Sequence, residues 1–75
     1  MAVVRRIREQ GTAPQRHPSE VDLAIFVVPT AGLIQLTTYG SDHRQSGPKP
    51  SQTLQFDRAQ ARRLLAILES FVNED

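Results

Sequence analysis

The sequence predicts a small α+β domain, in which an antiparallel sheet of three to four strands packs against one C-terminal helix. Three observations predict this fold class. Aliphatic residues run through 21–28 and, after a turn, through 33–39. A further extended segment, 51–56, leads directly into an apolar repeat with helical spacing over 58–72. A chain of 75 residues makes one domain with a modest core.

The first 20 residues precede the α+β domain, which we assign to residues 21–75. Val3, Val4 and Ile7 predict a short strand, because β-branched residues favour strands. The same three residues also form a short stripe on a helix. A basic arm that becomes ordered only on binding is a third interpretation. Glycine and two prolines mark the second half of this region as a linker.

Residues 21–39 predict a β-hairpin with the four-residue turn PTAG, in which Gly32 suits a positive φ. If Val28 faces Leu33 across the turn, all the aliphatic pairs fall on one face of the sheet. A shift of one residue would lose this match. The face that we expect under the helix carries Leu23, Ile25, Val27, Ile34 and Leu36.

The opposite face of the hairpin is only partly polar. It carries Ala24, Phe26, Val28, Leu33, Gln35, Thr37 and Tyr39. A solvated face of an antiparallel sheet should be polar, so something covers this face or it is a binding surface. The expected covers are the N-terminal segment and a second subunit. The expected ligands are nucleobases, which stack on aromatic rings such as Phe26 and Tyr39.

Residues 40–50, GSDHRQSGPKP, form a long polar loop in which Arg44 and Lys49 add positive charge. A loop of this length in so small a domain is often functional. The strand 51–56 that follows the loop is expected to pair beside the second strand of the hairpin.

The C-terminal helix, 58–72, is the clearest element of the sequence. Asp57 is a good N-cap, and Gln60 stands where a capping box has Glu or Gln. A wide apolar stripe predicts that the helix faces a sheet or another helix. The stripe consists of Ala61, Leu64, Leu65, Ile67, Leu68, Phe71 and Val72.

The charges on this helix oppose its macrodipole. Arg58, Arg62 and Arg63 lie in the first two turns, whereas Glu69 lies near the end. The macrodipole favours the reverse order by about 0.3–1 kcal/mol per terminal charge. One interpretation is a basic ridge that meets an anionic partner. The other is that arginine is a good helix former whose aliphatic stem covers apolar surface.

No pattern in the sequence predicts catalysis, a metal site or a cofactor. Ser41, Asp42 and His43 have the residue types of a hydrolase triad, but a triad converges from separate parts of a fold. His17 and His43 are too far apart in sequence for a shared short-spaced metal motif. We therefore expect a protein that is not an enzyme.

The location of the protein is predicted by what the sequence lacks. It has no cysteine, no apolar run long enough to span a membrane, and no signal-peptide pattern. We therefore expect a cytoplasmic protein without a membrane partner.

The order of elements resembles the PC4-type transcriptional coactivators. The residues that carry this resemblance are the basic loop GSDHRQSGPKP, the last strand SQTLQF and the helix DRAQARRLLAILESF, within residues 21–72. That family has a strand-rich sheet followed by a helix, dimerises through its helices and binds single-stranded DNA on its sheets. The resemblance implies the same for this chain.

Two functions compete on these observations. The first is a DNA-binding homodimer, in which arginines contact phosphates of single-stranded nucleic acid and aromatic rings stack on its bases. The candidate residues are Arg5, Arg6, Arg8, Arg44, Lys49, Arg58, Arg62, Arg63, Phe26 and Tyr39. The second is a protein-interaction module, an accessory subunit or an inhibitor, that binds its partner by the loop or by strand addition to the edge of 21–28.

Overall fold

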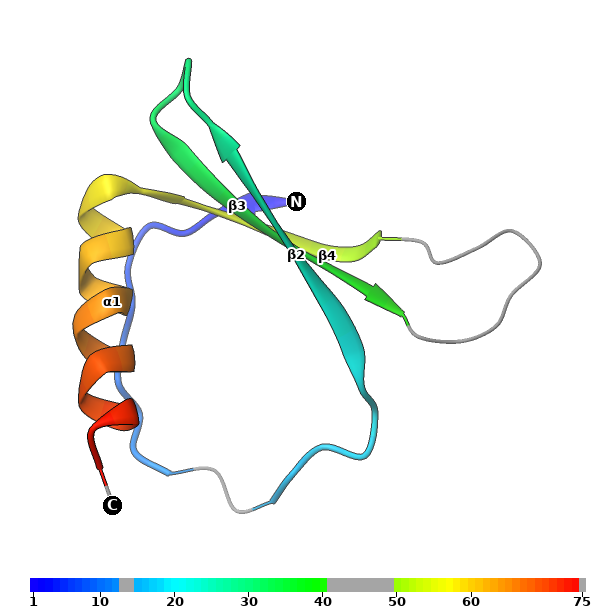
Figure 1. Ribbon diagram of the computed structural model, residues 1–75, viewed down its shortest axis with the longest axis vertical. Helices are drawn as coiled ribbons and strands as arrows, with labels where there is room; N and C mark the ends of the chain where they lie inside the picture. Colours follow the sequence, from blue (N-terminus) through cyan, green and yellow to red (C-terminus); the bar gives the residue numbers. More distant parts are fainter. Residues whose placement is uncertain (13–14, 41–49, 75) are drawn as a thin grey trace.

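The computed structural model describes residues 1–12, 15–40 and 50–74, and it confirms the α+β class (Figure 1). A four-stranded sheet has the order β1-β4-β3-β2, and one helix follows its last strand in the described part of the chain. The elements are β1 (Ala2–Val3), β2 (Val21–Val28), β3 (Leu33–Gly40), β4 (Pro50–Asp57) and α1 (Arg58–Val72). The sheet is mixed, because β1 runs parallel to β4 while the other pairs are antiparallel.

The β2–β3 hairpin has the predicted register. Val28 pairs with Leu33, which sets Val27 opposite Ile34 and Ile25 opposite Leu36 on one face. Gly32 has a φ of +66°, a conformation that residues with a Cβ rarely adopt, which is why glycine ends this turn. We call one side of the sheet the apolar face; it comprises Val21, Leu23, Ile25, Val27, Ile34, Leu36, Leu54 and Phe56.

The junction of β4 and α1 confirms the predicted N-cap. Asp57 is extended, with φ −76° and ψ 177°, and its carboxylate accepts a hydrogen bond of 2.8 Å from the backbone N–H of Gln60. The helix has the predicted bounds, 58–72. The strand before it is longer than predicted, since it begins at Pro50. A proline is tolerated at the first residue of a strand.

The helix covers less of the apolar face than the sequence predicted. It packs against β4 and β3 and not against β2. Leu23, Ile25 and Val27 were expected under the helix, but their exposed fractions are 55, 60 and 70%. The reason is the direction of α1, which leaves the end of β4 and diverges from the sheet (Figure 1). Among the described residues, the buried hydrophobic core is Phe56 alone, at 6% exposure.

The N-terminal segment joins the edge of the sheet and does not cover its second face. The predicted strand through Ile7 is reduced to β1, which pairs with β4. The backbone N–H of Val4 donates to the carbonyl of Gln55 over 2.8 Å. After that bond the chain leaves the sheet and runs beside α1 (Figure 1), where Arg63 donates to Glu9.

The cap at Asp57 gives a first test of this fold. Asp57→Ala removes the acceptor for the Gln60 N–H, so we expect the free energy of unfolding to fall by about 1 kcal/mol. Urea denaturation followed by circular dichroism measures this change. Asp57→Asn is the control, since asparagine caps nearly as well. An equal loss in both variants would contradict a capping role.

Candidate nucleic-acid interface

Two groups of arginines that lie far apart in the sequence meet at one end of the molecule. Arg5, Arg6 and Arg8 follow β1, and its parallel pairing with β4 sends them in the same direction as the chain that enters α1. Arg63 then contacts Glu9, with 3.3 Å between its guanidinium nitrogen and the carboxylate oxygen. The N-terminal segment is thereby held against the first turns of the helix.

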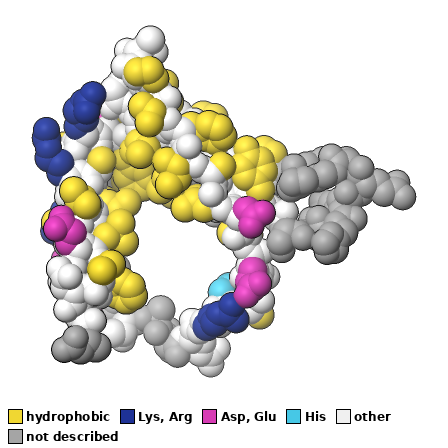
Figure 2. Space-filling view, in the orientation of Figure 1, with side chains coloured by type: hydrophobic (Ala, Val, Ile, Leu, Met, Phe, Trp, Pro, Cys, Tyr) yellow, Lys and Arg dark blue, Asp and Glu magenta, His cyan; other side chains and the backbone are white. Residues whose placement is uncertain are grey.

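This arginine cluster is exposed and poorly neutralised. We define it as Arg5, Arg6, Arg8, Arg58, Arg62 and Arg63, and all six are exposed. Glu9 and Asp57 are the acidic residues of these two segments. Figure 2 shows basic side chains at the outer edge of the molecule, beside the start of α1. The cluster therefore presents positive charge to the solvent around the start of α1.

The remaining predicted cations cannot be placed. Arg44 and Lys49 lie outside the described residues, as do Ser41, Asp42 and His43. Their predicted contribution to phosphate binding stays a prediction.

The two predicted aromatic residues share the second face of the sheet. Phe26 pairs with Gln35, and Tyr39 lies on the same side of β3 as Gln35. Phe26 is 46% exposed, and Tyr39 is half-buried. Tyr39 is near the far end of β3, about 20 Å along the strand from its start beside the helix. Tyr39 is also about 14 Å along β3 from Gln35, the partner of Phe26, so the two rings occupy separate places on the same face.

A hydrogen-bonded polar ladder lies between the aromatic residues and the β1 edge. Gln55 donates to Gln35 over 2.9 Å, Gln35 donates to the Thr37 hydroxyl over 3.1 Å, and that hydroxyl bonds Thr53 over 3.2 Å. Sequence reasoning missed this ladder. The sequence did contain a signal, because QLT at 35–37 is the reverse of TLQ at 53–55. Antiparallel pairing therefore places glutamine opposite glutamine and threonine opposite threonine.

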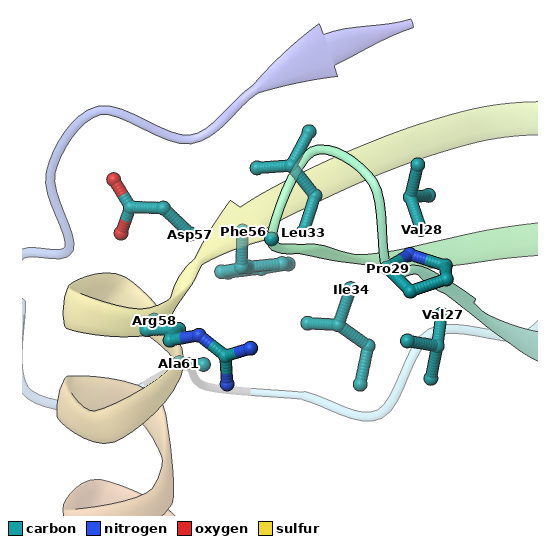
Figure 3. Close-up of a pocket in the computed structure, with 10 residues that line it drawn as sticks. Val27, Val28, Pro29, Leu33, Ile34, Phe56, Asp57, Arg58 and Ala61 are labelled. Carbon is teal, nitrogen blue, oxygen red and sulfur yellow. The ribbon is translucent and has the colours of Figure 1, made fainter.

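An apolar hollow opens beside the start of the helix. Its volume is about 320 Å³, and it lies where the hairpin turn approaches α1. Figure 3 shows Val27, Ile34 and Phe56 on the same side of the sheet as Ala61, with Arg58 at the rim. The hollow was not predicted, because it exists only where α1 diverges from the hairpin. It continues the uncovered apolar face towards the helix.

The described residues contain no group of three or more His, Asp or Glu side chains arranged to hold a metal ion. His17 has a structural contact, since its Nδ1 accepts the backbone N–H of Ser19 over 3.0 Å. In the same part of the chain, no helix is long and apolar enough to cross a membrane.

Comparison with known proteins places the chain in no family: no family model, no curated protein and no solved structure matches it. The resemblance to PC4-type coactivators therefore stays a prediction.

The contact between Arg63 and Glu9 gives a prediction for the arm. Both side chains are about half exposed, at 48 and 61%, and exposed ion pairs contribute little stability. We expect Glu9→Gln to change the free energy of unfolding by less than about 1 kcal/mol. Thermal unfolding measures this change. A larger loss would mean that Glu9 fixes the fold itself rather than only the position of the arm.

Proposed function

We propose that the chain is a small non-enzymatic protein that binds nucleic acid through the arginine cluster. The observation that carries this proposal is the meeting of the two arginine groups at one end of the molecule. Six exposed arginines on two adjacent segments suit a phosphate backbone, because each guanidinium group presents several hydrogen-bond donors to phosphate oxygens.

The position of the cluster on the helix supports the same function. The first turn of α1 contains no acidic residue and the last turn contains no basic one. This arrangement opposes the macrodipole in the free protein. A bound phosphate reverses the balance, because it is attracted both by the arginines and by the positive end of the helix.

The second face of the sheet offers side chains that could contact the bases of a nucleic acid whose phosphates bind the arginines. Phe26 and Tyr39 offer rings on the second face, and the Gln35 and Gln55 amides lie between them and the β1 edge. A strand that leaves the arginine cluster across this face would meet amide groups first and aromatic rings after them. Single-stranded nucleic acid suits such a surface, because its bases are free to stack.

The salt dependence of binding tests the role of the arginines. We expect a fluorescently labelled single strand to bind with a plot of log K against log salt whose slope is about −4 if six phosphates are neutralised. Arg62→Glu should weaken binding about tenfold at low salt and reduce the slope by about 1. Fluorescence anisotropy with single-stranded and duplex oligonucleotides measures both quantities.

The matched control is Arg16→Glu, which makes the same change in net charge. Arg16 pairs with Glu20 in the linker, away from the start of α1 (Figure 1). Equal weakening by the two variants would show that total charge, and not the cluster, governs binding. No binding at low salt would remove the proposal.

The role of the second face has its own test. Base stacking on one ring contributes about 1–3 kcal/mol. We therefore expect Phe26→Ala to weaken binding of a single strand at least about fivefold, and to leave duplex binding nearly unchanged. The salt slope should stay the same, because no charge is removed. Equal affinities of wild type and variant for the single strand would confine the site to the arginines.

A protein-interaction module is the second candidate function, and the edge strand favours it. β2 pairs with β3 on one side, and no described strand pairs with its other side. Its eight residues contain one charge, at Asp22, and no proline, so the edge lacks the usual protection against strand addition. The oligonucleotide experiment separates the two functions, because strand addition requires no nucleic acid.

A further inference from the structure

The isolated chain exposes much more surface than a compact protein of its size. Its accessible surface is 6694 Å², whereas a folded monomer of 8.4 kDa should have about 4600 Å². Its radius of gyration is 14.6 Å, against about 11 Å for a compact domain of 75 residues. The excess of roughly 2000 Å² is larger than the roughly 800 Å² that one partner contributes to a standard protein interface.

The excess includes two apolar surfaces that face the same opening. On the sheet, five residues of the apolar face are between 42 and 70% exposed: Val21, Leu23, Ile25, Val27 and Leu54. On α1, four residues of the apolar stripe are between 48 and 72% exposed: Leu65, Leu68, Phe71 and Val72. Figure 2 shows hydrophobic side chains along α1 and along the sheet on the two sides of the opening between them.

The two surfaces are matched in kind and in extent. Together they expose on the order of 900 Å² of apolar surface, close to the roughly 800 Å² that each partner contributes to a standard interface. About half of this area belongs to the helix and half to the sheet. Ala61, Leu65, Leu68 and Val72 are spaced as one row along α1, which is the shape that a flat sheet face accepts.

We propose that a second copy of this chain covers both surfaces, with α1 of each copy packed on the apolar face of the other. A two-fold axis relates the two copies, so the dimer has two identical contacts. In each contact, the exposed apolar residues of one helix pack on the exposed apolar residues of the other copy's sheet. A different protein would have to supply both an apolar surface that fits the helix and another that fits the sheet. A second copy of this chain supplies both, because it has the same exposed helix and the same exposed sheet.

The charges of the chain are compatible with this arrangement. Arg58, Arg62 and Glu69 flank one side of the exposed row of α1, and Arg58 and Arg62 lie beside Ala61 and Leu65. Their long side chains can border the contact while their charged groups stay in water. Asp22 is on the second face of the sheet, away from the contact. Among the described residues, the charged side chains nearest the two surfaces are at their border, where Asp57 and Arg58 line the hollow beside the start of α1. The evidence for this dimer does not depend on whether the chain binds nucleic acid.

Light scattering with substitutions on neighbouring residues tests the interface. We expect a dimer at 10–100 μM, and a loss of at least tenfold in dimer affinity in Ile25→Lys and in Leu68→Glu. Phe26→Lys is the matched control, because Phe26 is adjacent in sequence to Ile25 but lies on the other face of β2. A folded wild-type monomer at 100 μM would overturn the proposal and assign the surfaces to a different protein. A dimer broken by Phe26→Lys and not by Ile25→Lys would overturn it as well.

Cross-linking tests which surfaces meet, with variants too mild to unfold the chain. The sequence has no cysteine, so Ile25→Cys and Leu68→Cys each carry a single thiol. In a mixture of the two variants, a short bis-maleimide should join Ile25→Cys of one copy to Leu68→Cys of another. Each variant alone should cross-link much less. Efficient cross-linking of Leu68→Cys alone would indicate a helix–helix interface, and of Ile25→Cys alone a sheet–sheet interface; either result overturns the exchange of helices.

Discussion

The junction of Phe56 and Asp57 is the constraint on which the rest of this structure depends. Phe56 is a buried hydrophobic side chain that lines the same hollow as Ala61 of α1, and Asp57 begins the helix by accepting the N–H of Gln60. β4 also pairs with β1 on one side and β3 on the other. This short segment therefore fixes the direction of the helix, the path of the N-terminal arm and the position of the hairpin turn. The arginine cluster and the uncovered apolar face both follow from that direction.

Much of the local structure could be predicted, because it is encoded by neighbouring residues. Alternation of apolar and polar side chains determined the register of β2 and β3, Gly32 marked the turn, and Asp57 marked the start of the helix. The path of the N-terminal segment could not be predicted. Val3, Val4 and Ile7 favoured a strand but also fitted a helical stripe, and a two-residue parallel pairing leaves no pattern in the sequence.

The residues of the candidate site could be predicted from the sequence, but their proximity in the structure could not. Arginines at 5–8 and at 58–63 are equally visible in the sequence, yet nothing local states that they meet. Their proximity requires the pairing of β1 with β4 and the contact of Arg63 with Glu9. The covering of the sheet was mispredicted for a related reason. Alternation shows that Ile25 and Val27 belong to an apolar face, but the hydrophobic effect is non-directional and does not identify what covers it.

The two proposals use neighbouring strips of the same helix, the arginines on one strip and the exposed apolar row on the next. Packing of each α1 on the other copy's sheet would bury Leu65 and Leu68 and place Arg58 and Arg62 at the edge of the contact, where their charged groups can still reach water. The dimer would then carry two arginine clusters at a fixed separation. A nucleic acid long enough to reach both would bind the second cluster intramolecularly, which raises affinity without any new contact. Dimerisation and nucleic-acid binding would then stabilise each other, because a nucleic acid that contacts both clusters binds the dimer more tightly than the monomer. In the free chain, the arginines at the start of α1 interact unfavourably with the helix macrodipole. In the complex, bound phosphates would offset that unfavourable interaction, so the destabilisation occurs at the site that binds the ligand.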